Sequence, residues 1–168
     1  MVRFDGYLFV HGKSHYIRDK YMVSDCILCN ILKGDETYRN LILHKNKNFA
    51  ITLNLYPYNP GHLMVFPERH IEDIREMSED EFIIMHRLII KSMNILTGEY
   101  EPSGFNVGFN IGKTGGASIM HLHCHIVPRY KNELGMVDII AGTRILVEEI
   151  DKSYERLKRA FENYGEEV

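Results

Sequence analysis

Three histidines alternate with other residues in the segment His121-Leu122-His123-Cys124-His125. In an extended strand, side chains at i, i+2 and i+4 point to one face, so these imidazoles would share a surface opposite Leu122 and Cys124. Neutral imidazole, with a reference pKa of ~6.5, acts as a nucleophile, a proton donor or a metal ligand. The pattern predicts a functional site on a strand. The alternatives are a chance cluster of surface histidines and a strand that only binds metal.

Cys26 and Cys29 have the spacing of a CxxC motif. Two thiolates at this spacing can share one tetrahedral zinc ion, with histidines as the third and fourth ligands. Two histidines from His44, His62, His70 and the alternating three would complete such a site. A redox-active CxxC is the alternative, but the surrounding sequence does not read as a thioredoxin-like βαβ unit.

The sequence Gly112-Lys113-Thr114 looks like the end of a P-loop, but the full motif GxxxxGK[ST] requires a glycine where this chain has Val107. No helix is expected after it either, because the chain continues into the histidine segment. Two interpretations remain for this glycine-rich loop. It is a plain hairpin connection, or its backbone amides and Lys113 bind phosphate oxygens.

The alternating histidines need a sheet to hold them, and short apolar runs between turn residues predict its strands. The expected strands are two joined by a polar turn at Lys45 to Asn48, a buried one at Leu63 to Phe66 closed by Pro67, two flanking the glycine-rich loop at Gly104 to Ile111 and Ile119 to Pro128, and a short one at Tyr7 to Val10.

Helical periodicity predicts the remaining elements. A capping box at Ser78 to Glu81 begins an amphipathic helix that ends near Gly98, and a short helix begins at Cys26. A terminal helix carries one apolar stripe formed by Ile150, Tyr154, Leu157 and Phe161. Strands grouped with two main helices favour an α+β fold in which the helices cover one face of the sheet.

Composition excludes several classes of protein. A chain of 168 residues with 45% hydrophobic and 26% charged residues is typical of a single globular domain, and it is neither disordered nor a coiled coil. A net charge of −3 gives no overall basic surface for a nucleic acid. No apolar run approaches the ~20 residues of a membrane span, and the start lacks a secretory-signal pattern. With an odd number of cysteines, three, we expect a cytoplasmic protein without disulfides.

The chain resembles the histidine-triad (HIT) family, whose signature HxHxHxx matches His121 to Val127. The resemblance extends over the motifs CILCNI, NPGHLMVFPERH, GFNVGFNIG and HLHCHIVPRY. It implies a HIT-like antiparallel sheet with helices packed on it in a single domain, here 25–168 after an N-terminal extension 1–24. The motifs NLYPYNPGHLMVFPERH and DIIAGTRIL are similar to the branch with diadenosine tetraphosphate phosphorylases and hydrolases, which implies dinucleoside polyphosphate substrates.

The resemblance also implies roles for individual residues. His123 would attack the α-phosphorus and form a nucleotidyl-histidine intermediate, while His125 and His62 hydrogen-bond the phosphate oxygens and Ser118 lies near the leaving group. Asn110 would contact the phosphates, Asn54 the ribose, and apolar residues such as Phe49 and Ile51 the base. Zinc-containing relatives imply that the metal ligands are Cys26, Cys29, His70 and His121.

Several points stay open. Many members of the family have glutamine after the loop glycine where this chain has Ala117, so the second acceptor is water or inorganic phosphate. Hydrolysis of nucleoside phosphoramidates is another reaction of this class, and a zinc-stabilised nucleotide-binding protein is the non-enzymatic alternative. Because the chain is acidic overall, the phosphates would be met by local cations, of which the candidates are Lys113, Arg129, Arg69 and Arg144. The family also implies a homodimer formed by the long helix and a strand edge.

Overall fold

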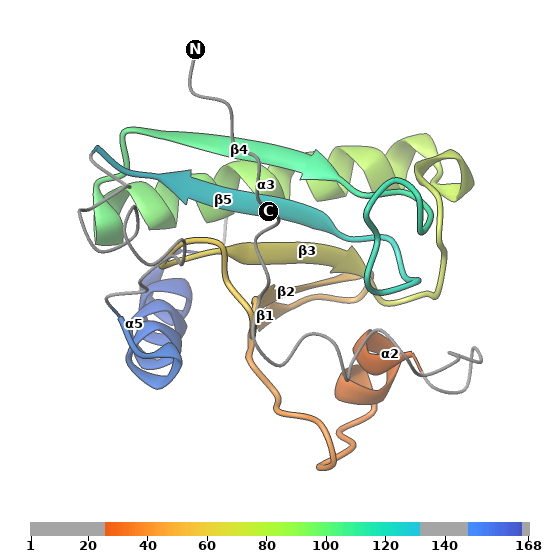
Figure 1. The fold of residues 1–168 in the computed structure, drawn as a ribbon, viewed down its shortest axis with the longest axis horizontal. Helices are drawn as coiled ribbons and strands as arrows, with labels where there is room; N and C mark the ends of the chain where they lie inside the picture. Colours follow the sequence, from red (N-terminus) through yellow and green to blue (C-terminus); the bar gives the residue numbers. More distant parts are fainter. Residues whose placement is uncertain (1–25, 132–147, 166–168) are drawn as a thin grey trace, which may run out of the picture.

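The computed structural model describes residues 26–131 and 148–165. Within them, five strands form one antiparallel sheet in the order β1-β2-β3-β5-β4 (Figure 1). The strands are β1 (Ile42–Lys45), β2 (Phe49–Leu53), β3 (Leu63–Pro67), β4 (Gly104–Phe109) and β5 (Cys124–Arg129). The predicted α+β fold with an antiparallel sheet is confirmed. The predicted strand Tyr7 to Val10 and Arg144 lie outside the described residues.

Side chains of β2 and β3 alternate between two buried layers. Ile51 pairs with Val65 and Ala50 pairs with Phe66. The two side chains of each cross-strand pair face the same side of the sheet. One face carries the main core, and the other face carries a smaller cluster around Ala50 and Phe66. All five residues of each strand are buried because both faces of the central sheet are covered.

Two helices cover the face of the main core. Helix α3 (Glu79–Tyr100) runs behind the sheet in Figure 1 and packs on β3 and β5, and α5 (Ile150–Asn163) packs on α3 and β1. The short helix α2 (Ile27–Leu32) contributes Leu28 to the smaller cluster on the opposite face. The prediction of helices on one face therefore holds for α3 and α5, and α2 departs from it.

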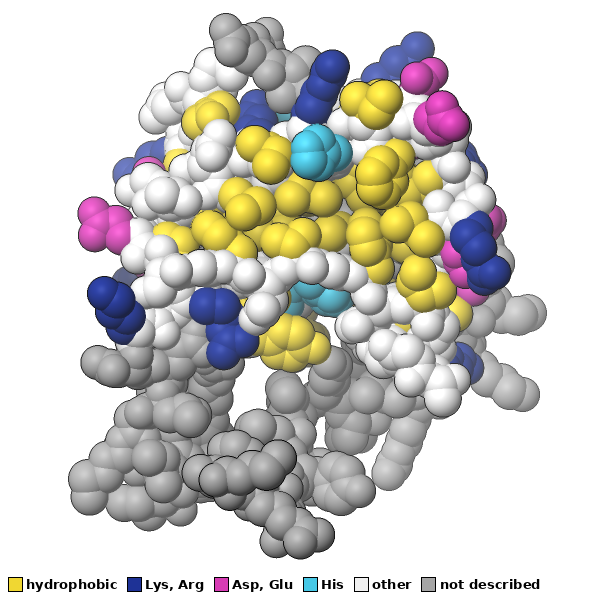
Figure 2. Space-filling model, turned by 90° about the horizontal axis from the view of Figure 1, so that it is seen from above, with side chains coloured by type: hydrophobic (Ala, Val, Ile, Leu, Met, Phe, Trp, Pro, Cys, Tyr) yellow, Lys and Arg dark blue, Asp and Glu magenta, His cyan; other side chains and the backbone are white. Residues whose placement is uncertain are grey.

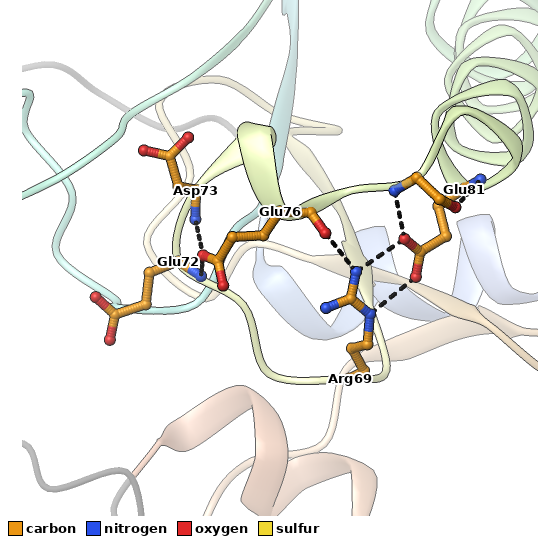
Figure 3. A network of polar contacts seen from close by, with 6 residues as sticks. Arg69, Glu72, Asp73, Glu76 and Glu81 are labelled. Atoms are coloured by element: carbon orange, nitrogen blue, oxygen red, sulfur yellow. Dashed lines mark hydrogen bonds and ion pairs between the residues drawn. The ribbon is translucent and has the colours of Figure 1, made fainter.

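Helix α3 begins at the predicted capping box, in which Ser78 and Glu81 bond each other's backbone N–H groups. The Glu81 carboxylate also accepts two hydrogen bonds from Arg69, which in turn donates to the carbonyl of Glu76 (Figure 3). The pKa of Glu81 falls to about 2, chiefly because of the Arg69 hydrogen bond. Since Arg69 is held in this network, the structure does not place it at a phosphate site.

The helix passes the predicted end near Gly98 and continues to Tyr100, where Glu101 caps it at φ 48°. The ring of Tyr100 packs against the core and against the turn at Gly61. Gly61 has φ +76°, and a Cβ there would lie 2.9 Å from Leu96 Cδ2, so glycine allows both the turn and the close approach of the helix. The contact of Tyr100 with this turn offsets the low helix propensity of Gly98 within α3.

The histidine segment joins the sheet later than predicted. The pairing of β3 with β5 reaches only to Val65 opposite Cys124, and before it the N–H of Leu122 bonds the carbonyl of Ile71 at 2.6 Å. Residues 119–123, which the sequence pattern places in a strand from Ile119 to Pro128, therefore lie before β5 and outside the sheet. The rings of His123 and His125 are nevertheless adjacent, with centroids 4.7 Å apart.

Neither the helices of 26–131 nor the one in 148–165 is long and apolar enough to cross a membrane.

Candidate active site and metal centre

A pocket of about 400 Å³ opens on the face of the sheet opposite α3 and α5. Its lining includes His123 and His125 together with apolar residues of α2 and neighbouring segments. Its remaining polar lining includes Thr52, Asn54, Asn110 and Ser118. A pocket of this size and mixed polarity fits one nucleotide-sized ligand.

The protonation of His123 follows from one hydrogen bond. Its Nδ1 lies 2.7 Å from the carbonyl oxygen of His121, and a carbonyl can only accept, so Nδ1 carries the proton. In the neutral ring Nε2 then holds a lone pair. Burial lowers the pKa of His123, which favours this neutral form at physiological pH. The ring is 2% exposed and still contributes to the pocket wall, which suits a nucleophile shielded from water.

A chain of three hydrogen-bonding groups defines the protonation of His125. The backbone N–H of Tyr58 donates to His62 Nδ1 at 3.1 Å, so the proton of a neutral His62 is on Nε2. That Nε2 lies 2.9 Å from His125 Nδ1, which therefore accepts. The remaining proton of His125 is on Nε2, which lies 3.5 Å from Nδ2 of Asn110, so two donors stand side by side at the pocket. His125 is thus a hydrogen-bond donor at the pocket, beside the lone pair of His123.

A second cluster joins Cys26, Cys29, His70 and His121, whose ligand atoms all lie within 4.8 Å of one another. The Sγ of Cys26 is 3.4 Å from His121 Nδ1, and the Sγ of Cys29 is 3.4 Å from His70 Nδ1. Tetrahedral zinc with bonds of ~2.3 Å to sulfur and ~2.1 Å to nitrogen separates its ligands by about 3.5 Å. The cluster therefore has the donor set and the spacing of a four-coordinate metal site.

His121 is prepared as a ligand by its other nitrogen. Its Nε2 lies 2.8 Å from the carbonyl of Pro67, so Nε2 carries the proton and Nδ1 presents its lone pair to the two thiols. Burial lowers the pKa of His121 to about 4 and keeps the ring neutral. Burial and the neighbouring Cys26 raise the pKa of the Cys29 thiol to about 11, so a metal would bind here by displacing a proton.

The HIT domain model matches residues 35–132, more than half of the chain. The chain belongs to the HIT family. It is 36% identical over 107 residues to an AP-4-A phosphorylase of Mycobacterium tuberculosis, a match that covers 63% of this chain and 55% of that protein. It is 26% identical over 99 residues to the asymmetrical bis(5'-nucleosyl)-tetraphosphatase of Schizosaccharomyces pombe, covering 59% of this chain and 54% of that enzyme. This chain thus spans about half the length of either enzyme.

Among solved structures, a zinc-bound histidine triad family protein of Mycobacterium smegmatis superposes with a TM-score of 0.68. The superposition covers 84% of this chain and 96% of that one at 22% sequence identity. At this identity the likeness shows a shared fold.

In this HIT protein, the structure brings most of the predicted site residues together. Asn54, Asn110 and Ser118 line the pocket with His123 and His125. The four predicted metal ligands form the separate cluster beside it, joined to the pocket through His121 and His123.

Besides His62, three predicted residues do not line the pocket. Phe49 and Ile51 are 0% exposed and belong to the main core under α3 and α5, so the prediction that they contact the base is wrong. Lys113 is exposed in the glycine-rich loop and is not part of the pocket lining.

The predicted role of His62 needs a correction. Its ring is 0% exposed and is surrounded by Tyr58, Asn54 and His125, so it cannot touch a phosphate in this geometry. Its Nε2–H instead donates to Nδ1 of His125, and His125 lines the pocket.

The sequence did not indicate which residues form the apolar side of the pocket. Ile27, Leu28 and Ile31 of α2 line it together with Tyr38 and Leu41 of the following segment. In the sequence, the only indication of this role was that the CxxC motif lies in a short apolar helix. Arg39 also stands at the pocket and pairs with Asp151 of α5, a contact between residues 112 positions apart that no local pattern predicts.

Proposed function

We propose that this HIT protein cleaves dinucleoside polyphosphates, with diadenosine tetraphosphate as the type substrate, through a nucleotidyl-His123 intermediate. The observation that carries the proposal is the 2.7 Å hydrogen bond from His123 Nδ1 to the His121 carbonyl, which leaves Nε2 as a lone pair beside a nucleotide-sized pocket. The similarity to a phosphorylase and to a tetraphosphatase supports the substrate class.

In the first step, the lone pair of His123 Nε2 attacks the α-phosphorus. A P–N bond forms, the bond from phosphorus to the bridging oxygen breaks, and the leaving polyphosphate takes the electron pair. Developing negative charge on the phosphate is met by the Nε2–H of His125 and by the amide of Asn110. Ser118 also lines the pocket and would donate to the leaving oxygen.

In the second step, an acceptor oxygen attacks the same phosphorus from the side that the leaving group vacated. A P–O bond forms, the P–N bond breaks, and the electron pair returns to His123 Nε2. When the acceptor is water, its proton is released to solvent. Water gives a nucleoside monophosphate, whereas inorganic phosphate gives a nucleoside diphosphate. The phosphorylase and the tetraphosphatase among its relatives make both acceptors reasonable, and the product decides between them.

The rest of the nucleotide is assigned by the chemistry of the pocket wall. The base lies against Ile27, Leu28 and Ile31 of α2, which replace the wrongly predicted Phe49 and Ile51. The ribose hydroxyls lie near Asn54, whose Oδ1 already accepts from the N–H of Tyr56 at 3.0 Å and can accept a second bond.

The metal centre is assigned to zinc. Two thiols and two imidazoles at tetrahedral spacing are the ligands that zinc prefers in structural sites, and four protein ligands leave no position for substrate. When bound, zinc would cross-link α2 to the segments that carry His70 and His121 and would take no part in the reaction.

We assign the quaternary state to a homodimer. β4 is an edge strand, and seen from the side of β4 and α3, hydrophobic side chains form a continuous band across the molecule (Figure 2). The exposed apolar residues of these two elements are Phe82, Ile83, Ile90 and Val107, each 44–50% exposed. An unprotected edge beside such a band is typical of a surface that associates.

The test is the variant His123→Asn with diadenosine tetraphosphate as substrate. The variant should keep its circular dichroism spectrum and its affinity for the product nucleotide, and lose turnover by roughly 10³-fold or more, as removal of a covalent nucleophile does. Wild-type product is analysed with and without inorganic phosphate: monophosphate in both indicates water, and diphosphate only with phosphate indicates phosphorolysis.

Wild-type turnover in His123→Asn would exclude the covalent mechanism. Binding of nucleotide by the wild type without any turnover would instead favour the zinc-stabilised binding protein. Turnover of a nucleoside phosphoramidate alone would retain the His123 mechanism and change the substrate.

A further inference from the structure

We propose that the metal centre and the nucleotide pocket are energetically coupled, so that occupation of one site raises the affinity of the other. The proposal rests on the proposed nucleotide site. Its basis is that three of the four metal ligands, Cys26, Cys29 and His121, stand on two segments that also line the pocket. The fourth ligand, His70, follows β3.

The first shared wall is α2. Cys26 is the N-cap of this helix and Cys29 lies in its first turn. Ile27, Leu28 and Ile31 of the same helix line the pocket. The helix has six residues, no side-chain N-cap bond and no acidic residue in its first turn, so it has little stability of its own. Its packing depends on the small cluster that includes Leu28, Ala50 and Phe66. Cross-linking both thiolates to His121 would therefore fix the wall that holds the base.

The second shared wall is the segment before β5. His121 presents Nδ1 to the thiols, while its backbone carbonyl accepts the Nδ1–H of His123 at 2.7 Å. This segment is not held by the sheet, because the pairing of β3 with β5 begins only at Cys124. Its anchors are the bond from His121 Nε2 to Pro67 and the bond from Leu122 N–H to Ile71. His121 is thus a positioning residue that links a metal ligand to the nucleophile.

The coupling is expected to be positive, because each bound group would order residues that belong to the other site. Metal would order α2 and residue 121 before nucleotide arrives, and nucleotide packed against Ile27 and Ile31 would hold the thiols toward His121. Coupling between two binding sites is reciprocal, so both affinities change by one factor. We expect a factor of about 10, within the range usual for coupled sites.

The experiment measures both halves of this reciprocity on the full chain. Affinity for adenosine monophosphate is measured by calorimetry on zinc-loaded and zinc-free protein, whose folding is checked by circular dichroism. Affinity for zinc is measured by competition with a chromogenic chelator, with and without saturating adenosine monophosphate. Both affinities should rise by about 10-fold when the other site is filled.

A second readout does not need the metal-free chain. In cobalt-loaded protein, adenosine monophosphate should shift the visible absorption bands of the cobalt ion, because the nucleotide contacts the segments that carry the ligands. A metal that only stabilised the fold would give no shift. This readout also decides the matter if the metal-free chain does not fold.

Two variants separate the coupling from the sites themselves. Ile31→Ala shortens the shared wall without touching a ligand, so it should leave zinc affinity in the absence of nucleotide unchanged and reduce the coupling factor toward 1. Cys124→Ala is the matched control, since this third cysteine is buried on the opposite face and should leave the coupling intact.

Equal affinity for adenosine monophosphate in folded zinc-loaded and zinc-free chains, with no cobalt shift, would overturn the inference and leave the nucleotide site standing. Absence of nucleotide binding even to zinc-loaded protein would overturn both the inference and the proposed function.

Discussion

At the scale of single residues, the site depends on which nitrogen of each imidazole carries a proton. Carbonyls fix the protons on His121 and His123, and a backbone N–H fixes the one on His62, so three main-chain groups determine the whole set. The spacing of the histidines indicates that they belong together. It cannot reveal these roles, because the partners Pro67 and Tyr58 are brought in by the fold.

His62 tests this residue-level argument. His62→Gln removes the ring that accepts from Tyr58 and donates to His125, so His125 loses its fixed orientation and its Nε2–H is no longer specified. We expect kcat to fall by about 10²-fold, the usual cost of misplacing a catalytic group, with KM changed little because His62 does not touch the pocket.

The matched control is His44→Gln, which changes a histidine on β1 that stacks on Phe161, away from the pocket. A rise in KM with kcat preserved in His62→Gln would mean that His62 contacts substrate after all.

At the scale of helices and strands, sequence patterns predicted those element ends that local interactions determine. The capping box gave the start of α3, and polar turns gave the ends of β1 and β2. The same patterns failed to predict which face of the sheet a side chain occupies, because tertiary contacts determine it. Every residue of β2 is buried, so its alternation gave no sign that Phe49 and Ile51 face α3 and α5 while Thr52 faces the pocket.

The ion-pair network at the start of α3 gives an element-scale prediction. Glu81 has its pKa lowered to about 2 from 4.5, so the stability it contributes is complete above about pH 4.5 and is lost as the pH falls toward 2. Glu81→Gln should lower the free energy of unfolding by about 1 kcal/mol at neutral pH, a value discounted for partial exposure.

Urea denaturation of wild type and Glu81→Gln from neutral pH to pH 2 measures this, with Glu79→Gln on the same helical turn as the control. The difference between wild type and Glu81→Gln should shrink through the acid range. A constant difference at every pH would contradict the assignment to the ionised carboxylate.

At the scale of the whole molecule, the two faces of the sheet have different roles. One face carries the main core under α3 and α5, and the other carries the pocket and the metal cluster. Composition and motif order were enough to predict one α+β domain. They could not predict that the apolar side of the pocket comes from α2, because that contact joins segments far apart in the sequence.

The apolar band on β4 and α3 gives the prediction at this scale. Light scattering coupled to size exclusion should find two chains per particle for the wild type at micromolar concentration. Ile90→Glu combined with Val107→Glu places charges in the band and should give one chain per particle with an unchanged circular dichroism spectrum.

Glu155→Lys on the exposed side of α5 is the control and should remain a dimer. Dimers that persist in the double variant would exclude this band as the interface.

The proposed reaction requires a covalent bond between His123 and the α-phosphorus, and its stereochemical course reveals whether that bond forms. A dinucleoside polyphosphate that is chiral at the α-phosphorus by sulfur substitution is turned over in isotopically labelled water or phosphate, and the configuration of the product is determined. Two successive in-line displacements, first by His123 and then by the acceptor, predict net retention. Net inversion would exclude the nucleotidyl-His123 intermediate, because it requires a single direct attack by the acceptor.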